Sequence, residues 1–525
     1  MNGTYDIAVV GSGFAGSLLA MIARRLGLSV VLIEKGSHPR VVIGESSTPL
    51  SNLLLEELTN RYDLPALRPL AKWGSWQKTY PGVACGLKRG FTFHHHILGS
   101  PASPDPSRRN QLLVAASPRD EVADTHWYRA DFDQLLVEEA QKLGVEYVDQ
   151  VRLQRFADCD SDVKLEGQRN RQDVTFRVKF VIDATGPRGF LHHVMDLRES
   201  ELPSHPATQA LYSHFSGVRR LAETQHSRTG DTPPYPIDDA AVHHVFDGGW
   251  IWVLQFNNGV TSAGVAATDD LALGLRFADG AEAWGRLLHL IPALHEQFAT
   301  AKAERPFTHI SRLTFRSAQI AGNRWALLPS AAGFVDPLLS TGFPLTLLGV
   351  ARLAEIIEQE WGRPRFDARL QVYATQTDGE LVATSRLIAS LYASMNNFSV
   401  FAALSLLYFA AASYSEAARR LEKPELASSF LLCEHPVFGP ASVQLFDRAR
   451  KPLSRSESAE LIRDILATIE PFNVAGLGRA ERRNWYPVEA NDLLEAAGKL
   501  NATSSEIMKM IERCGFHPER EPARS

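Results

Sequence analysis

The chain has 525 residues, and its 55 lysines and arginines against 60 aspartates and glutamates give a formal net charge of -5. Because these charges form no acidic or basic block, a nucleic-acid partner is not expected. The cysteines, Cys85, Cys159, Cys433 and Cys514, lie far apart without a CxxC pair, which favours reduced thiols in a reducing compartment. A chain of this length is expected to form two or three structural regions.

Met1 leads almost directly into the first predicted strand, which leaves no room for a signal peptide, so we expect a cytoplasmic protein. The most apolar stretch, Phe398 to Tyr414, is interrupted by serines and is shorter than a bilayer requires. We therefore predict a buried helix there and no transmembrane segment. An apolar substrate wall and a membrane-surface contact are the alternatives.

The N-terminal stretch has the pattern of a dinucleotide-binding unit. Ile7 to Val10 form the apolar run of a buried parallel strand, a helix is predicted from Ser17 to Leu26, and Glu34 ends a second strand. A G-x-G-x-x-G turn joins strand to helix. Its glycines allow a tight bend and a close approach to a pyrophosphate, and the terminal acid can accept from a ribose hydroxyl. The residues assigned to the dinucleotide are Gly11, Gly13, Phe14, Ala15, Gly16 and Glu34.

Helices and strands alternate after this unit. Helical patterns cover Leu50 to Tyr62 and Asp131 to Leu143, and strands are predicted around Val145 to Val151 and Val174 to Ile182. The last of these strands leads into Asp183-Ala-Thr-Gly186. An acid and a glycine at the carboxyl end of a parallel strand are well placed to contact a second part of the same dinucleotide.

The middle of the chain, from about residue 207 to residue 316, has a mostly β pattern and predicts a separate antiparallel sheet on the substrate side. The rest is mainly helical after residue 367, with amphipathic stretches at Leu370 to Tyr392 and Ser456 to Ile469. The predicted domains are residues 1–190 and 317–366 for the nucleotide, 191–316 for the β-rich substrate domain, and 367–525 for a helical C-terminal region.

The segment from Asp336 to Gly342 precedes an apolar helix. Ser340 or Thr341 is a suitable N-cap, Pro344 suits the first turn, and Leu345 to Ile357 continues with helical periodicity. The N–H groups and the dipole of such a helix would stabilise an anion, by about 0.3–2 kcal/mol from the dipole alone. An ordinary capped helix is the alternative.

Together these pieces resemble the FAD-dependent hydroxylase superfamily and, within it, the flavin-dependent halogenases. The motifs that carry the resemblance are the glycine fingerprint, a helix opened by Arg129-Ala-Asp-Phe-Asp133, the Asp183-Ala-Thr-Gly186 strand end, and Ala-Gly333-Phe-Val-Asp336-Pro. Gly44-Glu45-Ser46 is similar to the halogenase loop beside the flavin. The resemblance implies an α/β fold, namely a glutathione-reductase-type FAD-binding Rossmann domain with an inserted antiparallel β substrate domain and a helical C-terminal region.

The same resemblance implies the site residues. The FAD-binding set gains Glu45, Ser46, Arg129, Asp183, Gly186, Ser330, Gly333, Asp336 and Gly342, and the halide-binding residues are Ser340, Thr341 and Gly342. Lys72-Trp-Gly74 falls where the family carries its catalytic lysine in a Lys-x-Gly setting, so Lys72 is the predicted catalytic residue. The alternatives are Lys78 and neither lysine. In such enzymes a buried lysine directs hypohalous acid onto the substrate. Arg129 contacts the flavin side in related enzymes, and a surface cation is the alternative.

Three departures from the family pattern bear on the reaction. Trp250-Ile-Trp252 keeps both tryptophans of Trp-x-Trp-x-Ile-Pro but lacks the Ile-Pro that is linked to suppression of hydroxylation. The two tryptophans should share one strand face, and core packing is their alternative role. Ser330 stands where the superfamily has an aspartate, so it supplies no charge. Leu339 stands where tryptophan-type halogenases have a glutamate, which favours the phenol or pyrrole type.

The resemblance implies an FAD-dependent oxidoreductase, a halogenase of secondary metabolism that uses reduced FAD, dioxygen and chloride or bromide on an electron-rich aromatic substrate, free or carrier-tethered. Only one fingerprint is visible, so a separate flavin reductase is expected. The alternatives are a flavin-dependent aromatic monooxygenase and a non-catalytic flavin-binding interaction protein. His94-His95-His96 alternates faces on a strand without a suitably spaced partner, so no metal site is expected.

Overall fold

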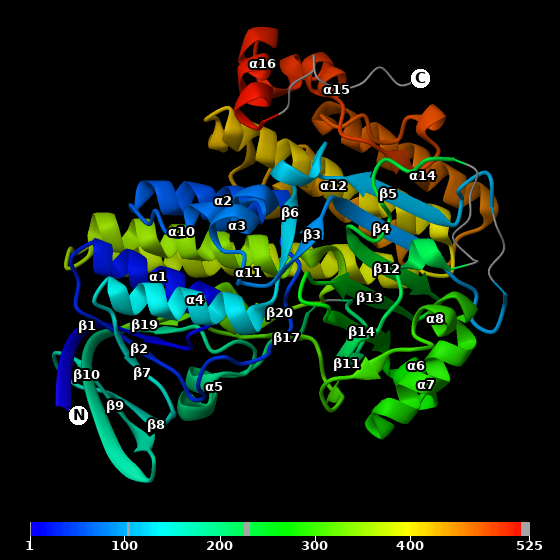
Figure 1. Ribbon diagram of the computed structural model, residues 1–525. Helices are drawn as coiled ribbons and strands as arrows, with labels where there is room; N and C mark the ends of the chain where they lie inside the picture. Colours follow the sequence, from blue (N-terminus) through cyan, green and yellow to red (C-terminus); the bar gives the residue numbers. More distant parts are fainter. Residues whose placement is uncertain (1, 102–104, 203, 225–230, 516–525) are drawn as a thin grey trace.

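The structure is a computed structural model that describes residues 2–101, 105–202, 204–224 and 231–515. Figure 1 shows a nucleotide-binding sheet on the side of the N-terminus, a second sheet beside it, and long helices that cross both. The fold is mixed α/β with a helical C-terminal region, as predicted from the sequence.

The central strands of the nucleotide-binding sheet are parallel. They are apolar runs buried within the protein, as parallel strands covered on both faces require. Its strand order is β18-β19-β10-β1-β2-β7, and β9 and β8 extend it antiparallel from β10. The strands are β1 (Asn2–Val10), β2 (Val30–Ile33), β7 (Glu146–Val148), β8 (Val151–Asp158), β9 (Val163–Arg169), β10 (Gln172–Asp183), β18 (Ala321–Gly322) and β19 (Trp325–Leu327). The segment around residue 325 thus returns to the first sheet, as predicted.

The second sheet has the order β15-β11-β14-β13-β12-β4-β5-β21, with β16 paired to β11. Its strands are β4 (Gly90–His95), β5 (Gln111–Ala115), β11 (Thr208–Ser216), β12 (Ala241–Phe246), β13 (Gly249–Gln255), β14 (Thr261–Thr268), β15 (Lys302–Ala303), β16 (Thr308–Ile310) and β21 (Trp485–Tyr486). Most pairs are antiparallel, but β4 lies parallel to β12 and β21 parallel to β5. Strands from outside residues 191–316 therefore complete this sheet.

One face of the second sheet is covered by helices that the β-like sequence pattern did not predict. These are α6 (Asp269–Gly274), α7 (Ala281–Leu290) and α8 (Pro292–Gln297). They share an apolar core with the strands, in which Phe215 and Trp284 stack with ring centroids 5.7 Å apart. The other face packs against the main core, which continues into the C-terminal helices.

The remaining helices surround the nucleotide-binding sheet and form the C-terminal region (Figure 1). They are α1 (Phe14–Arg25), α2 (Pro49–Arg61), α3 (Trp73–Thr79), α4 (Arg129–Lys142), α5 (Phe190–Met195), α9 (Pro329–Ala332), α10 (Gly342–Glu360), α11 (Phe366–Ala393), α12 (Phe398–Arg420), α13 (Phe438–Ala449), α14 (Arg455–Ile469), α15 (Ala490–Glu495) and α16 (Ser504–Arg513). Two short pairs complete the fold: β3 (Cys85–Lys88) with β6 (Asp124–Trp127), and β17 (Phe315–Arg316) with β20 (Gly333–Phe334).

Two helical segments of the described chain, Leu338–Glu360 and Phe398–Arg420, are long and apolar enough to cross a membrane by length and composition alone. Inside the protein 72% and 83% of their apolar windows are buried. The stretch from Phe398 thus forms the buried helix that the sequence predicts, although it is longer than expected.

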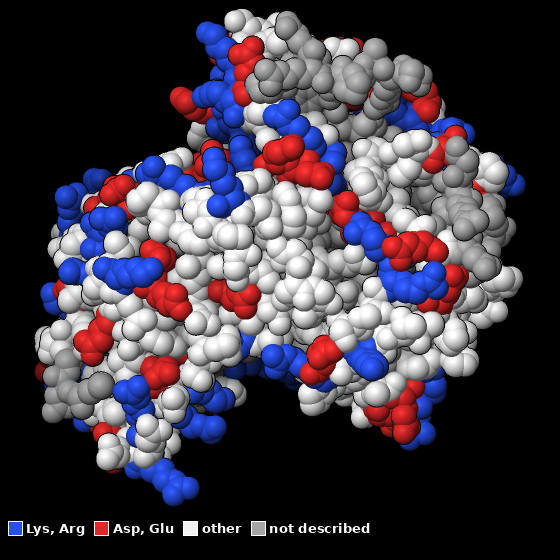
Figure 2. Space-filling model, viewed as in Figure 1, with Lys and Arg blue, Asp and Glu red and all other residues white. Residues whose placement is uncertain are grey.

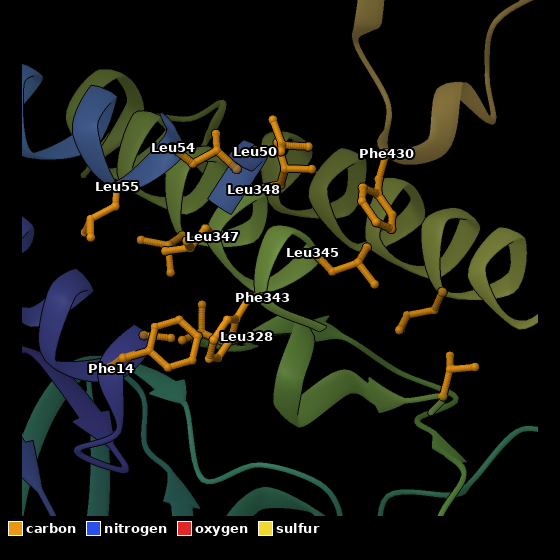
Figure 3. Packing of buried hydrophobic residues seen from close by; sticks show 14 of the residues in the cluster. Phe14, Leu50, Leu54, Leu55, Leu328, Phe343, Leu345, Leu347, Leu348 and Phe430 are labelled. Carbon is orange, nitrogen blue, oxygen red and sulfur yellow. The ribbon is translucent and has the colours of Figure 1, made fainter. Parts of the chain in front are cut away.

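The start of α10 is fixed by apolar packing against α1 and α2. Figure 3 shows Phe343 facing Phe14, and their ring centroids are 4.9 Å apart. Leu347 and Leu348 pack on the other side, near Leu54 of α2. Burial of each such side chain contributes about 1.5–3 kcal/mol. The N-terminus of α10 is therefore held at a defined place relative to the glycine fingerprint.

Surface charge is mixed. Figure 2 shows lysine and arginine interspersed with aspartate and glutamate over the face drawn, around a broad uncharged area at its centre. This face therefore carries no large field of one sign.

Candidate active site

The glycine fingerprint needs its glycines for steric reasons. Gly11 follows β1 directly and has φ +103°, and a Cβ there would lie 2.6 Å from the Ala184 carbonyl oxygen. A Cβ on Gly16 would lie 2.0 Å from the Gly11 carbonyl oxygen. Near Gly13 a Cβ would meet only side-chain tips, with the Arg129 guanidinium nearest at 3.3 Å. The turn therefore leaves a cradle above Gly13 that is bordered by the side chains of Arg129, Arg40 and Asp133.

Glu34 lies at the end of β2, and its carboxylate faces the fingerprint turn. Oε2 accepts hydrogen bonds from the backbone N–H and hydroxyl of Ser12 at 3.0 and 2.9 Å, and Oε1 accepts from Gly36 N–H at 2.9 Å. Burial would raise the pKa of Glu34, but the charge of Arg40 and these N–H groups outweigh it and lower the pKa. Glu34 is therefore an ionised acceptor beside the cradle.

Arg129 is buried at the start of α4 and is not a surface cation. Its Nε and Nη2 each donate to Asp133 at 2.7 Å, and its Nη1 donates to the Gly44 carbonyl oxygen at 2.9 Å. The guanidinium also lies 5.0 Å from the centroid of the Phe14 ring. Arg129 thus connects α4 to the Gly44-Glu45-Ser46 loop at the edge of the cradle.

The Gly44-Glu45-Ser46 loop reaches toward the second sheet. A hydrogen bond of 2.8 Å joins Glu45 Oε1 to His214 Nε2 of β11, and both residues are buried. Ser46 forms an isolated β-bridge with His126 of β6. The sequence predicted Glu45 and Ser46 as site residues but gave no indication of His214, whose partner lies 169 positions away.

Lys88 lies directly behind this loop and is fully buried. Its Nζ donates to Ser46 Oγ at 2.8 Å and to the Ser47 carbonyl oxygen, and lies 3.9 Å from the centroid of the Phe91 ring. Lys88 is paired directly opposite Asp124 across β3 and β6. Burial lowers the pKa of the Lys88 ammonium and raises the pKa of the Asp124 carboxyl. A buried amine of lowered pKa is suited to reactive chemistry.

Lys72, the lysine selected from the sequence, has a different setting. It is half-buried as the N-cap residue of α3 and lines the rim of a cavity, whereas the alternative Lys78 is exposed. The glycine of Lys72-Trp-Gly74 has a packing role, because a Cβ on Gly74 would lie 2.7 Å from the Glu121 carbonyl oxygen. Lys88-Arg-Gly90 has the same spacing, which was the sequence signal for the buried lysine.

A cavity of about 200 Å³ lies between the start of α2, α12 and the C-terminal elements. Its wall includes the aromatic residues Phe91, Tyr408, Phe409 and Tyr486. The charged residues that line it include Asp124 on the Lys88 side and the pair of Glu416 and Arg420, which are 2.8 Å apart. The cavity thus combines aromatic walls with a carboxylate beside the buried lysine.

The loop before α10 is anchored by Asp336, which is buried and accepts hydrogen bonds from Trp250, Tyr392 and the Leu338 backbone. Burial raises the pKa of Asp336 to about 7. Leu339 and Ser340 have φ of 63° and 55°, a left-handed conformation that is uncommon for such residues.

The first turn of α10 matches the prediction only in part. Thr341 is the N-cap residue, but its side chain makes no capping hydrogen bond. A Cβ on Gly342 would meet nothing within 4 Å. The helix start therefore faces open space with its N–H groups uncapped by Thr341, an arrangement suited to an anion.

The other predicted site residues lie at the carboxyl end of β10 and in α9 and β20. Asp183 ends β10 and accepts from the N–H groups of Thr185 and Leu191, at 2.9 and 2.7 Å, and burial raises its pKa. Gly186 has φ +85° with open space around it. Ser330 is half-buried in α9, and Gly333 packs closely against Leu381.

Trp250 and Trp252 lie on one face of β13, as predicted, with ring centroids 5.7 Å apart. Both are buried in the main core, so core packing is part of their role. Within the described ranges of the chain, no group of three histidines, cysteines or carboxylates is placed to hold a metal ion.

The Rossmann-like fold, the fingerprint cradle and the acid at the end of β2 define a dinucleotide-binding oxidoreductase of the FAD type. A family model described as tryptophan halogenase matches residues 123–399, and one described as an NAD(P)-binding Rossmann-like domain matches residues 9–48. The chain belongs to the tryptophan halogenase family and is an FAD-dependent halogenase with halide as co-substrate. The predicted family, fold class and cofactor are confirmed.

Similar proteins share most of the chain. Tetracycline 7-halogenase of Kitasatospora aureofaciens is 27% identical over 77% of this chain and 74% of its own length. Monodechloroaminopyrrolnitrin halogenase PrnC of Pseudomonas fluorescens is 30% identical over 67% of this chain and 61% of its own. The crystal structure of halogenase PltM with phloroglucinol and FAD superposes with a TM-score of 0.77 at 24% identity, covering 91% of this chain and 99% of PltM.

Proposed function

We propose that this halogenase modifies an electron-rich aromatic substrate in the cavity beside Asp124, and that Lys88 directs hypohalous acid onto it. The observation that carries the proposal is the place of Lys88, buried between the Gly44-Glu45-Ser46 loop and the cavity wall. Motif spacing alone predicts Lys72, but the half-buried position of Lys72 at the cavity suits substrate contact better than halogen transfer.

The residues present fit FAD. The cradle above Gly13, bordered by Arg129, Arg40 and Asp133, suits a pyrophosphate at the start of α1, and Glu34 is an ionised acceptor for a ribose. The open space at Gly342 suits the flavin end with a halide. The bound cofactor supplies the oxidation of halide to hypohalous acid.

The chain's own residues then control that oxidant. Oxygens of Ser46 and Ser47 hold Lys88 Nζ in one position, and burial favours its neutral amine. This amine holds hypohalous acid against the substrate, while the aromatic walls exclude water. In the transfer the C–H bond of the ring and the O–X bond break, a C–X bond forms, and the proton leaves with the hydroxide as water.

The relatives support an aromatic substrate. The printed names include a tetracycline halogenase and two enzymes that halogenate pyrrole-2-carbonyl groups on a carrier protein, and the PltM structure contains phloroglucinol. A small or carrier-tethered aromatic substrate is therefore supported. A separate flavin reductase, a cytoplasmic location and the domain boundaries given above remain predictions.

The test is an assay with FAD, a flavin reductase, NADH and bromide or chloride on a panel of phenols, pyrroles and indoles, with products identified by mass spectrometry. We expect halogenated product from the wild type and no such product from Lys88→Ala, with flavin oxidation unchanged. Lys78→Ala, at an exposed lysine, is the matched control. Loss of halogenation in Lys72→Ala but not in Lys88→Ala would reverse the assignment.

The same assay separates halogenase from hydroxylase. Oxygen insertion without halogen, insensitive to Lys88→Ala, would support an aromatic monooxygenase. Omission of the reductase tests the partner, because turnover with NADH alone would contradict a two-component enzyme.

A further inference from the structure

Asp124 has one unused acceptor in the cavity wall. Its Oδ1 accepts from Asn52 Nδ2 at 2.7 Å, but its Oδ2 is buried and has no hydrogen-bond partner among the described residues. Buried carboxylate oxygens are almost always paired, since an unpaired one retains its full desolvation cost. The nearest cation does not satisfy it, because Lys88 Nζ donates to Ser46 and Ser47 and forms no ion pair with Asp124 in the described part of the chain.

The other carboxylates of the same cavity are already paired. Three acidic residues line it, and Glu416 and Glu489 contact Arg420 and Arg482 at 2.8 and 3.1 Å. Asp124 is also the most buried of the three. Among the carboxylates of this wall, Asp124 is therefore the one with a buried oxygen that has no partner among the described residues, and Ser117 Oγ is a second such polar atom in the wall.

We propose that Asp124 Oδ2 accepts a hydrogen bond from the hydroxyl of a phenolic substrate and thereby sets both the substrate class and the ring position that is halogenated. This inference rests on the proposed function of the same cavity. The matching donor must belong to the ligand, and the aromatic wall beside Asp124 accommodates the ring that carries it.

The position of Asp124 explains why its ligand would be the reacting ring. Directly opposite residues of an antiparallel pair have Cβ atoms about 4.5–5.5 Å apart, so Asp124 and Lys88 project side by side. A ring held through its hydroxyl at Asp124 consequently presents the carbon next to the C–O bond to Lys88. Burial raises the pKa of Asp124, so this step applies above that pKa, where the residue is a carboxylate. A hydrogen bond to the carboxylate then increases the electron density of the phenol ring, which favours electrophilic halogenation there.

The experiment compares a phenol with its methyl ether, which has the same ring but no donor. We expect the wild type to prefer the phenol in kcat/KM by about 100-fold or more, because a site built to pair a hydroxyl rejects analogues that lack it. Asp124→Ala should reduce this preference to less than about tenfold and lower the share of ortho product. Glu416→Gln, at the carboxylate already paired with Arg420, is the matched control and should retain the preference.

A general structural defect would lower kcat/KM for phenol and ether alike, so the ratio isolates the hydroxyl contact. An unchanged ratio in Asp124→Ala would overturn the proposal. Pyrrole and N-methylpyrrole form a second arm, and an Asp124-dependent preference for pyrrole but not for phenol would overturn the phenol assignment.

Titration calorimetry with the FAD-loaded, unreduced enzyme measures the affinity for the phenol and for its methyl ether without turnover. Weaker binding in Asp124→Ala with no change for the ether supports the contact. Because Lys88→Ala should leave this binding preference intact, failure of the halogenase mechanism and failure of the Asp124 contact are distinguishable.

Discussion

Trp250 Nε1 donates a hydrogen bond of 3.1 Å to Asp336 Oδ1, which joins the second sheet to the loop before α10 across 86 positions of sequence. Tyr392 of α11 donates to the other oxygen at 2.9 Å. Three distant segments therefore meet at one buried carboxylate. The first tryptophan of the Trp-x-Trp motif makes this contact although the Ile-Pro that usually follows is missing.

Trp250→Phe and Tyr392→Phe each remove one donor and keep an aromatic ring. We expect Tyr392→Phe to lower the free energy of unfolding by about 1–3 kcal/mol, because Asp336 Oδ2 is left unsatisfied. Trp250→Phe should cost less, because Asp336 Oδ1 keeps the hydrogen bond from the Leu338 N–H. The double variant should be non-additive, since both donors serve one carboxylate. Urea denaturation measures the free energy of unfolding of all three variants. Trp252→Phe is the control: Trp252 Nε1 makes a longer hydrogen bond of 3.3 Å to Ser262, so its loss should lower the free energy of unfolding less. Strict additivity would show that the two contacts are independent.

Asp336 should make the protein less stable as the pH rises. Burial raises its pKa from 3.8 to about 7, so the folded state keeps a proton that the unfolded chain releases. The contribution of protonated Asp336 to the free energy of unfolding is complete below about pH 4 and is lost as the pH rises through 7. Asp336→Asn should therefore lose less stability than the wild type between pH 5 and pH 8. Denaturation midpoints at both values test this, and parallel losses would contradict it.

His243 should act in the opposite direction. Its ring lies between Phe93 and Trp250, with centroid distances of 4.4 and 5.2 Å, and burial lowers its pKa from 6.5 to about 3. The contribution of neutral His243 to the free energy of unfolding is present above pH 6.5 and is lost as the pH falls toward 3. The reason is that His243 binds a proton at a higher pH in the unfolded chain than in the folded protein. His243→Phe keeps the stacking and should flatten the acid limb of a stability profile between pH 4 and pH 7. An equally steep limb would show that other groups dominate it.

The parts of the fold that could be predicted are those set by local pattern. The fingerprint unit, the return strand near Trp325 and the C-terminal helices follow from apolar periodicity and glycine spacing within short windows. The membership of β4, β5 and β21 in the second sheet could not be predicted, because it depends on pairing between distant strands. Helices α6 to α8 were missed because they are short and because α6 begins directly after β14.

The same limit applies to the site. The sequence contains three Lys-x-Gly patterns, at Lys72, Lys88 and Lys142, and spacing alone does not separate them. The pairing of β3 with β6 separates them, since it buries Lys88 opposite Asp124. The unused oxygen of Asp124 likewise depends on which neighbours the fold supplies.

The anion site at the start of α10 can be tested without disturbing the fold. In Gly342→Ala the new methyl group projects into space that is open in the protein, so stability should be unchanged or higher by up to about 1 kcal/mol. If halide or flavin occupies that space, the same methyl group should raise the KM for halide or weaken FAD binding severalfold. Gly285→Ala, in the remote helix α7 with equally open surroundings, is the matched control and should change neither. A Gly342→Ala enzyme with wild-type halide KM and FAD affinity would place both ligands away from this helix start.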